Sequence, residues 1–254
     1  MTTNNVEWSV EDAERIYGVS SWGGGYFKIG ENGNIQVSPD PKNANIKIDF
    51  KSVIDEITLE GIQFPVVIRF HDILRSQVVG INECFNQVIA DAKYQGRYNG
   101  VYPIKVNQTR EVVEEIVDAG APYDYGLEAG SKAELLAVLA YNTNANSLTI
   151  LNGYKDEEFI RLSLLGRKLG RKVVVVIEKF SELHLLIRIS KELNIEPIIG
   201  LRSKMSALGK GKWQGSSGDR AKFGLTIPEI INAAKFLEKE GMGHTLKLLH
   251  FHIG

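Results

Sequence analysis

The sequence predicts an α/β fold built on a parallel sheet. From residue 65 onward, short apolar segments alternate with amphipathic helical segments, an order typical of parallel strands joined by right-handed crossovers. The segment 173–177 consists of valines and an isoleucine and lacks the alternation of a half-exposed strand, which favours a strand buried on both faces. Two architectures fit these observations, an open doubly wound sheet and a (β/α)8 barrel.

About seven segments carry the strand pattern, and a helix is expected after each of them except the last. The strands are expected at 65–70, 100–105, 123–128, 147–152, 172–178, 196–202 and 246–253. The helices are expected to begin near Asp72, Thr109, Ser131, Asp156, Ser181 and Pro228. Because a closed barrel of this type has eight strands, a barrel built from these segments would be incomplete.

A smaller N-terminal extension is expected over residues 1–62, followed by the strand-and-helix domain over 63–254. The extension is predicted to contain a helix, a β-hairpin and a second helix, at 7–17, 26–37 and 50–60. Ser9 is placed to cap the first helix, and Asn32-Gly33 supplies the residues of a tight hairpin turn. Gly61 is expected to end the second helix.

The composition argues against several classes of protein. The formal net charge of the 254 residues is −1, so no basic surface for nucleic acid or for a membrane is indicated. The single cysteine, Cys84, excludes an internal disulfide framework and favours a cytoplasmic location; we expect its side chain in a core. The polar N-terminus does not resemble a signal peptide, and the apolar runs are shorter than the roughly 18 residues of a membrane span.

Lys105 falls where an expected strand ends. In β/α barrels the carboxyl ends of the strands form the active site, so this position is a candidate for catalysis. A lysine held among apolar neighbours has its charged form disfavoured, and the neutral amine is a nucleophile. The ordinary alternative is a lysine whose ammonium group reaches water.

Two further charged residues fall at expected strand ends. Glu128 could orient a cofactor or balance the charge of Lys105, and Gly130 would let the backbone approach a ligand closely; the alternative for Glu128 is a solvated loop carboxylate. Arg202 could bind an anion with its planar set of donors, or form a salt bridge to a neighbouring loop.

The last expected strand carries two histidines. His250 and His252 are two residues apart, so they are expected to face the same way. They could bind zinc together, or one could pack while the other stacks on a planar ligand. The segment before this strand and its helix, 203–224, is rich in Gly, Ser and Lys without periodicity, and we expect a long loop there.

Several motifs together resemble the biosynthetic arginine decarboxylases. The segments that carry the resemblance are "YGVSSWGGGYFKIGENGNIQV", "VYPIKVNQTREVVEEI", "YGLEAGSKAEL", "LNGYKDEEFIRLSLLGRKLGRKVVVVIEKFSEL", "GLRSKMSALGKGKWQGSSGDRAKFGL" and "LLHFHIG". These enzymes belong to the pyridoxal phosphate (PLP)-dependent barrel decarboxylases, which include ornithine and diaminopimelate decarboxylases. The resemblance implies a TIM-type, PLP-binding (β/α)8 barrel of which this chain contains about seven strands.

The resemblance also implies roles for individual residues. Lys105 matches the lysine that binds PLP covalently, Glu128 matches an acidic residue near the cofactor, and Arg202 matches an arginine at its rim. His252 matches the histidine that stacks on the pyridine ring. Lys222-Phe223-Gly224 matches a motif near the subunit interface of relatives.

The activity implied is the decarboxylation of L-arginine to agmatine and carbon dioxide, the first step of putrescine and spermidine biosynthesis. The resemblance also implies a homo-oligomer and a possible Mg²⁺ requirement, although no cluster of metal ligands in the sequence supports the latter. The eighth strand and a C-terminal β domain are expected in this family after residue 254, so we expect a fragment that is inactive alone and poorly soluble. The alternatives are ornithine or diaminopimelate decarboxylase, a non-catalytic PLP-binding barrel, and a metal-dependent hydrolase built on the two histidines.

Overall fold

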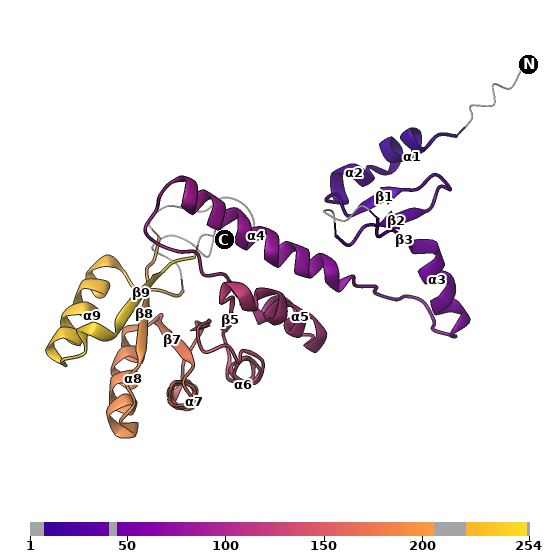
Figure 1. The fold of residues 1–254 in the computed structure, drawn as a ribbon. Helices are drawn as coiled ribbons and strands as arrows, with labels where there is room; N and C mark the ends of the chain where they lie inside the picture. Colours follow the sequence, from indigo (N-terminus) through magenta and orange to yellow (C-terminus); the bar gives the residue numbers. More distant parts are fainter. Residues whose placement is uncertain (1–7, 41–44, 206–221, 253–254) are drawn as a thin grey trace, which may run out of the picture. The chain divides into compact units, whose positions relative to one another are not determined.

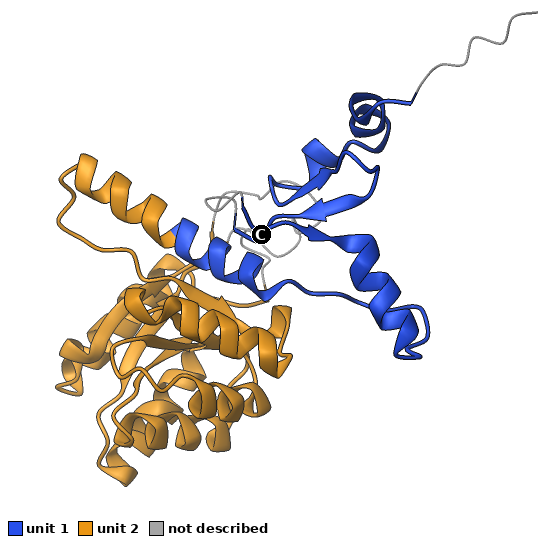
Figure 2. Ribbon diagram, turned by 45° about the vertical axis from the view of Figure 1, so that its right-hand side comes forward, with its two compact units in different colours: residues 1–81 blue, residues 82–254 orange. Residues whose placement is uncertain are grey.

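The fold is known from a computed structural model that describes residues 8–40, 45–205 and 222–252. The chain divides into two compact units, Met1–Ile81 and Asn82–Gly254 (Figure 2). The division falls within helix α4, His71–Asp91. The assignment of residues 63–254 to a single domain stays a prediction.

The first unit has the helix, hairpin and helix expected from the sequence. Its elements are α1 (Val10–Tyr17), α2 (Val19–Trp22), β1 (Phe27–Ile29), β2 (Ile35–Val37), β3 (Ile48–Asp49) and α3 (Phe50–Leu59). The Ser9 side chain caps α1 by accepting a hydrogen bond from the Asp12 backbone N–H at 3.1 Å. Gly33 has the positive φ, +81°, that the hairpin turn requires. Strand β3 was not expected, because two residues are too short for a periodic signal.

The strand expected at 65–70 is absent from the structure, so that prediction is wrong. Residues 66–70 belong to no helix or strand, and α4 begins directly afterwards at His71. The Val67 side chain is 76% exposed, whereas the Phe70 ring packs against the rings of Phe27 and Phe50 within the first unit. An apolar run becomes a strand only where a neighbouring strand bonds its backbone, and among the described residues none does so here.

The second unit contains a parallel sheet of six strands, one fewer than the sequence suggested. Their order is β4-β5-β6-β7-β8-β9, which is also their order in the chain. The strands are β4 (Val101–Pro103), β5 (Gly126–Ala129), β6 (Leu148–Leu151), β7 (Lys172–Ile177), β8 (Ile198–Arg202) and β9 (Leu246–His250). The helices are α5 (Arg110–Gly120), α6 (Lys132–Tyr141), α7 (Glu157–Lys168), α8 (Phe180–Leu193) and α9 (Ile227–Lys239), with short 3-10 turns η1 (Ile104–Val106), η2 (Ala121–Tyr123) and η4 (Gly243–Thr245).

This sheet is a curved, incomplete barrel wall with helices on its outer side. Figure 1 shows α6 to α9 following one another around one side of the strands. Every neighbouring pair of strands is parallel, as the alternating sequence pattern predicted. The fold class expected from the sequence, an α/β barrel that is incomplete in this chain, is therefore confirmed.

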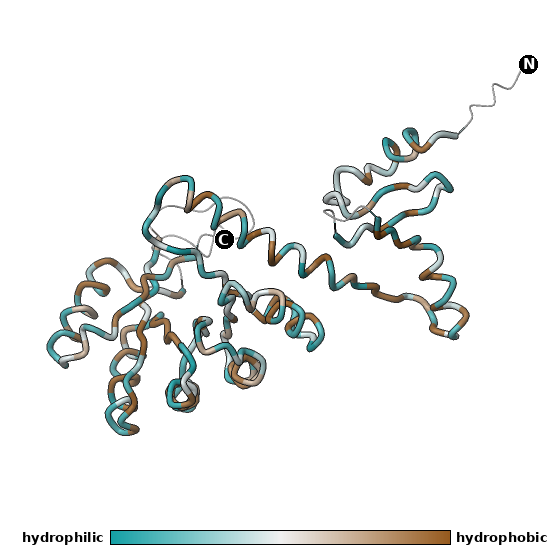
Figure 3. Tube along the Cα trace, in the orientation of Figure 1, coloured by the Kyte–Doolittle hydropathy of each residue, from teal (hydrophilic) through white to brown (hydrophobic). Residues whose placement is uncertain are grey.

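Helices α6 and α7 begin directly after Ser131 and Asp156, near which the sequence predicted their starts. The Ser131 and Asp156 side chains accept hydrogen bonds from the backbone N–H groups of Glu134 and Phe159, at 3.3 and 2.9 Å. Such bonds satisfy donors that the first turn of a helix otherwise leaves free, and each contributes about 1 kcal/mol. Hydrophilic and hydrophobic residues alternate along the helices of the trace (Figure 3), and helices α5 to α9 each bury some of their apolar residues.

Strand β7 is buried on both faces, as its unbroken apolar sequence predicted. Val173, Val175 and Ile177 belong to the core between the sheet and the helices. Val174 and Val176 point to the opposite, inner face, where they pack with Ile150, Val101, Leu148, Ile198 and Leu248. The inner face is therefore apolar along the strands, and the next residue on the same face of β7 is Glu178.

The expectation that Cys84 lies in a core is wrong, because its side chain is exposed on α4. The same helix exposes Ile81, Phe85 and Val88. The sequence of α4 does contain an apolar pattern, but the described residues form no core against these three side chains.

Among the described residues, no helix is both long enough and apolar enough to span a membrane.

Candidate functional site

Six polar residues lie at the carboxyl ends of the six parallel strands. Because the strands are parallel, these ends share one edge of the sheet. The residues, in strand order, are Lys105, Glu128, Asn152, Glu178, Arg202 and His250. The sequence singled out four of them; it missed Asn152 and Glu178.

Lys105 and Glu128 form an ion pair across the first two strands. The Lys105 Nζ lies 3.4 Å from the Glu128 Oε1, and Pro103 and Glu128 are partners in the register of β4 and β5. The Lys105 side chain is 57% exposed, which agrees with the alternative in which its ammonium group reaches water rather than the one in which apolar neighbours surround it. The amine can therefore be reached by a carbonyl compound from solvent, with a carboxylate beside it.

The turn that carries Lys105 is fixed on both sides. Ile104 is 2% exposed and packs into the core between the sheet and the helices, which anchors η1. The Tyr102 hydroxyl donates to the Asn107 carbonyl oxygen at 3.1 Å, and Asn107 Oδ1 accepts from the Thr109 N–H at 3.0 Å. Burial raises the pKa of Tyr102, so its hydroxyl keeps its proton and stays a donor at neutral pH.

Arg202, the last residue of β8, and Glu178, directly after β7, form a buried ion pair. The Arg202 Nη1 lies 3.0 Å from the Glu178 Oε1; the Arg202 side chain is 14% exposed and that of Glu178 is 0% exposed. The sequence left two alternatives for Arg202, an anion-binding group or a salt bridge, and the structure shows the salt bridge. Glu178 was missed, although it carries the same signal as the others, a charged residue directly after a buried strand.

The Glu178 carboxylate also holds the loop that follows β6. Its Oε1 accepts a second hydrogen bond, 2.8 Å long, from the Gly153 backbone N–H. Its Oε2 is buried and has no hydrogen-bond partner among the described residues. A buried carboxylate oxygen without a partner is costly, which makes this atom a candidate acceptor for a bound molecule.

A second buried ion pair lies beside the first. The Lys155 Nζ is 3.6 Å from the Glu182 Oε2 and donates to the Gly153 carbonyl oxygen at 2.6 Å. Burial lowers the pKa of Lys155, although Glu182 and Glu178 act in the opposite direction. The N–H and the C=O of Gly153 are thus bonded to two buried side chains of opposite charge.

The two histidines occupy different surroundings. His250 is the register partner of Arg202, and its Nδ1 is buried without a partner among the described residues. Burial, and then the Arg202 charge, lower the pKa of His250, so its ring is neutral at pH 7. His252 follows the end of β9 and is exposed. The expected shared face on one strand is therefore not formed, because β9 ends at His250.

Residues 8–40, 45–205 and 222–252 contain no group of three or more His, Cys, Asp or Glu side chains that could hold a metal ion. The centre of the expected long loop, residues 206–221, lies outside the described residues. The two ends of that loop return to the same edge of the sheet. The Leu225 N–H donates to the Arg202 carbonyl oxygen at 2.7 Å, and the Arg202 guanidinium lies 5.8 Å from the Phe223 ring centroid.

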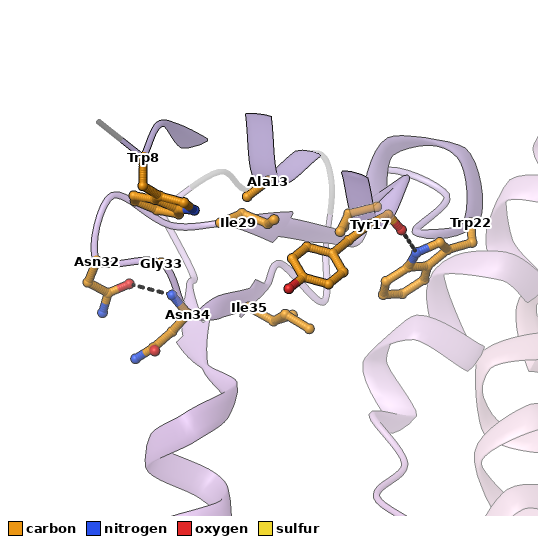
Figure 4. Close-up of a pocket in the computed structure, with 10 residues that line it drawn as sticks. Trp8, Ala13, Tyr17, Trp22, Ile29, Asn32, Gly33, Asn34 and Ile35 are labelled. Carbon is orange, nitrogen blue, oxygen red and sulfur yellow. Dashed lines mark hydrogen bonds between the residues drawn. The ribbon is translucent and has the colours of Figure 1, made fainter. Parts of the chain in front are cut away.

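A separate cavity of about 730 Å³ lies in the first unit (Figure 4). Trp8, Tyr17 and Trp22 form part of its wall, and the Trp22 Nε1 donates to the Tyr17 carbonyl oxygen at 3.1 Å. The residues that line it include no charged side chain and none of the strand-end residues. Its chemistry is therefore different from that of the charged edge of the sheet.

Known proteins resemble this chain over nearly its whole length. Residues 81–254 match the family described as pyridoxal-dependent decarboxylase, pyridoxal binding domain. The biosynthetic arginine decarboxylases of Phocaeicola vulgatus and Rhodopirellula baltica are each 46% identical over 248 residues, 98% of this chain. The chain spans 39% and 37% of the lengths of these two relatives.

Solved structures give the same picture. The biosynthetic arginine decarboxylase of Campylobacter jejuni superposes with a TM-score of 0.79 at 35% identity, over 94% of this chain and 38% of that one. A diaminopimelate decarboxylase from M. jannaschii in complex with L-lysine superposes with a TM-score of 0.65 at 17% identity, over 90% of this chain and 48% of that one, which shows the shared fold alone.

Proposed function

Because this chain belongs to the pyridoxal-dependent decarboxylase family, we propose that it binds PLP at the charged edge of its sheet and serves the decarboxylation of L-arginine to agmatine and carbon dioxide. The resemblance seen in the sequence motifs is confirmed at the level of the family. The choice of arginine is supported by relatives 44–46% identical over 98% of the chain, which are named biosynthetic arginine decarboxylases. That reaction would be the first step of polyamine biosynthesis.

The residues at this edge fit PLP. The aldehyde of PLP reacts with a primary amine, and the exposed Lys105 amine is available at the end of β4. PLP also carries polar ring substituents and a phosphate, which need hydrogen-bonding partners. His250 Nδ1 is a buried atom that lacks a partner among the described residues, and Arg202 offers a guanidinium at the same edge.

The residues of this chain then have distinct tasks. Lys105 would supply the amine that holds the PLP aldehyde, and Glu128, whose Oε1 lies 3.4 Å from the Lys105 Nζ, would orient that amine. Arg202, whose Nη1 donates to Glu178, would present its remaining N–H donors to an anionic group. His252, exposed just after β9, would stack on the pyridine ring, as the family resemblance implies. When bound, PLP supplies the electron sink that a decarboxylation needs.

The observation that carries the proposal is the exposed Lys105 amine beside Glu128 at the shared edge of the parallel sheet. The chain is incubated with PLP, reduced with borohydride and digested, and the labelled peptide is mapped by mass spectrometry. We expect label on Lys105, and none on Lys155, whose amine is buried. The variant Lys105→Arg keeps the charge and removes the reactive amine. Equal, scattered labelling of the variant and the natural chain would contradict the proposal.

The substrate is tested by carbon dioxide release from arginine, ornithine and diaminopimelate. The chain is assayed alone, and after fusion to the part of the Phocaeicola vulgatus relative that follows the matched region. We expect the fusion to act on arginine. Preference for ornithine or diaminopimelate would move the chain to another branch of the family, and bound PLP without any release would favour a non-catalytic PLP-binding barrel.

Four further expectations remain predictions. A cytoplasmic location is supported by the single cysteine. A homo-oligomer, a Mg²⁺ requirement, and a chain that is inactive alone and poorly soluble are what the family resemblance implies. Light scattering of the purified chain and of the fusion tests the oligomer, and an assay with and without a chelator tests the metal.

A further inference from the structure

We infer that Glu178 is a positioning residue for Arg202: its buried carboxylate fixes the guanidinium, and the Gly153 loop beside it, at the edge where PLP is proposed to bind. The ligand part of this inference rests on the proposed function. Glu178 was not singled out from the sequence. Its hydrogen bonds to Arg202 and Gly153 in the structure identify it.

Glu178, Arg202 and His250 lie side by side at the ends of three neighbouring strands. Ile177 and Leu201 are register partners, so Glu178 stands opposite Arg202, which is itself the partner of His250. The single oxygen Oε1 of Glu178 accepts from both the Arg202 Nη1, at 3.0 Å, and the Gly153 N–H, at 2.8 Å. The carboxylate is therefore a bridge between the β6 loop and the end of β8.

The backbone of Glu178 strengthens this bridge. Its carbonyl oxygen accepts from the Gly224 N–H at 3.1 Å, and its N–H donates to the Glu182 Oε2 at 2.9 Å. Because Glu178 is bonded through both its backbone and its side chain, its carboxylate has little freedom to move. Arg202 has five N–H donors, and its bond to Glu178 uses one of them. The others can bind an anion in an orientation that Glu178 has already set.

Charge balance explains why a carboxylate is needed at this position. Glu178 pairs with Arg202 and Glu182 pairs with Lys155, so the cluster holds two negative and two positive side chains. A buried charge is tolerated when it is paired and hydrogen-bonded. Loss of the Glu178 charge leaves Arg202 partly buried without its counterion, so the guanidinium will turn toward water. PLP binding must then reorder that side chain.

The first test needs no cofactor. Glu178→Gln keeps the shape and an oxygen acceptor for Gly153 but removes the charge. Glu114→Gln makes the same change at a carboxylate of α5 whose partner is Arg110. NMR follows exchange of the Arg202 guanidinium N–H protons with water. We expect exchange to quicken about tenfold in Glu178→Gln and less than about twofold in Glu114→Gln, since charge-assisted hydrogen bonds are the stronger kind. Unchanged exchange in Glu178→Gln overturns the inference.

The second test is a double-mutant cycle on PLP binding. The dissociation constant of PLP is measured for the natural chain, Glu178→Gln, Arg202→Gln and the double variant. We expect Glu178→Gln to weaken binding about tenfold when Arg202 is present and less than about twofold when it is absent, because Glu178 acts through Arg202. A purely structural role would give the same weakening in both backgrounds, and that result overturns the inference.

The two tests separate the inference from the proposed function. If the natural chain binds no PLP, the proposed function fails for this chain, and the NMR result alone decides whether Glu178 positions Arg202. If PLP binds and Arg202→Gln has no effect, the inference is overturned while the proposed function stands. Cooperative thermal unfolding of each variant shows that the effects come from folded protein.

Discussion

The Lys105 Nζ lies 3.4 Å from the Glu128 Oε1, yet the Lys105 side chain is more than half exposed. An exposed ion pair of this kind contributes about 0–1 kcal/mol to stability. The pair is therefore of interest for its position at the carboxyl ends of two parallel strands, because its contribution to the stability of the fold is small.

Replacing Lys105 should remove cofactor attachment without unfolding the chain. We expect Lys105→Ala to lower the free energy of unfolding by less than about 1 kcal/mol, because an exposed pair is lost. The neighbouring change Ile104→Ala should cost about 2–5 kcal/mol, because that side chain is 2% exposed in the core. Urea unfolding of both variants measures this. Similar losses for the two variants would show that Lys105 has a structural role.

Gly153 should not tolerate a side chain. Its φ is +78°, and a Cβ there would lie 2.5 Å from the Gly130 carbonyl oxygen. We expect Gly153→Ala to destabilise the chain by more than the roughly 1–2 kcal/mol of left-handed backbone strain alone.

Gly170→Ala is the matched control for that change. Gly170 has a φ of +83°, and a Cβ there would have no atom within 4 Å. The difference between the two variants in thermal unfolding isolates the contact with Gly130. Equal destabilisation by Gly153→Ala and Gly170→Ala would mean that the loop moves away from the added Cβ. Only the positive φ would then require glycine at position 153.

The buried Lys155 should make stability depend on pH. Burial lowers its folded-state pKa below the ordinary value of 10.5. Between these two values the unfolded chain binds more protons than the folded chain, so the contribution of Lys155 to stability rises with pH in that window. We expect the difference in unfolding free energy between the natural chain and Lys155→Met to increase toward alkaline pH. Lys168→Met, at an exposed lysine on α7, is the control for loss of a lysine side chain. A difference for Lys155→Met that does not change with pH would contradict the prediction.

The pKa of His250 should report on the charges around it. Burial and the Arg202 charge lower it, and His252 lowers it further, whereas Glu128 and Glu178 raise it. We therefore expect Arg202→Gln to raise the pKa of His250, as followed by NMR titration. A lowered or unchanged pKa in that variant would show that His250 does not sense the Arg202 charge.

The titration of His250 should also make the stability of the folded chain depend on pH in the acidic range. Because its folded-state pKa lies below the ordinary value of 6.5, the unfolded chain binds more protons between the two values. The contribution of His250 is therefore lost as the pH falls through that window. The loss should be smaller in His250→Asn, which urea unfolding at several pH values can measure.

The sequence by itself determined the local structure of this protein. Hydrophobic periodicity placed the six strands from β4 to β9, because a strand buried on both faces leaves an unbroken apolar run, as in Val173–Ile177. Side-chain caps such as Ser131 and Asp156 placed the helix starts, because capping depends on residues within one turn. The rule that strand ends in a barrel form the site identified Lys105, Glu128 and Arg202.

Only the tertiary structure decided which partners those residues have. The apolar run at 65–70 has the composition of a strand, but no described strand bonds to it. The sequence left open whether apolar neighbours or water surround Lys105, and the structure shows it exposed, because burial depends on chain segments distant in sequence. The bridge from Glu178 to Gly153 and Arg202 spans 25 and 24 residues, and no local pattern encodes such a contact. The sequence determines which hydrogen bonds and ion pairs a side chain can form, whereas the packing of the strands determines which partners lie close enough to form them.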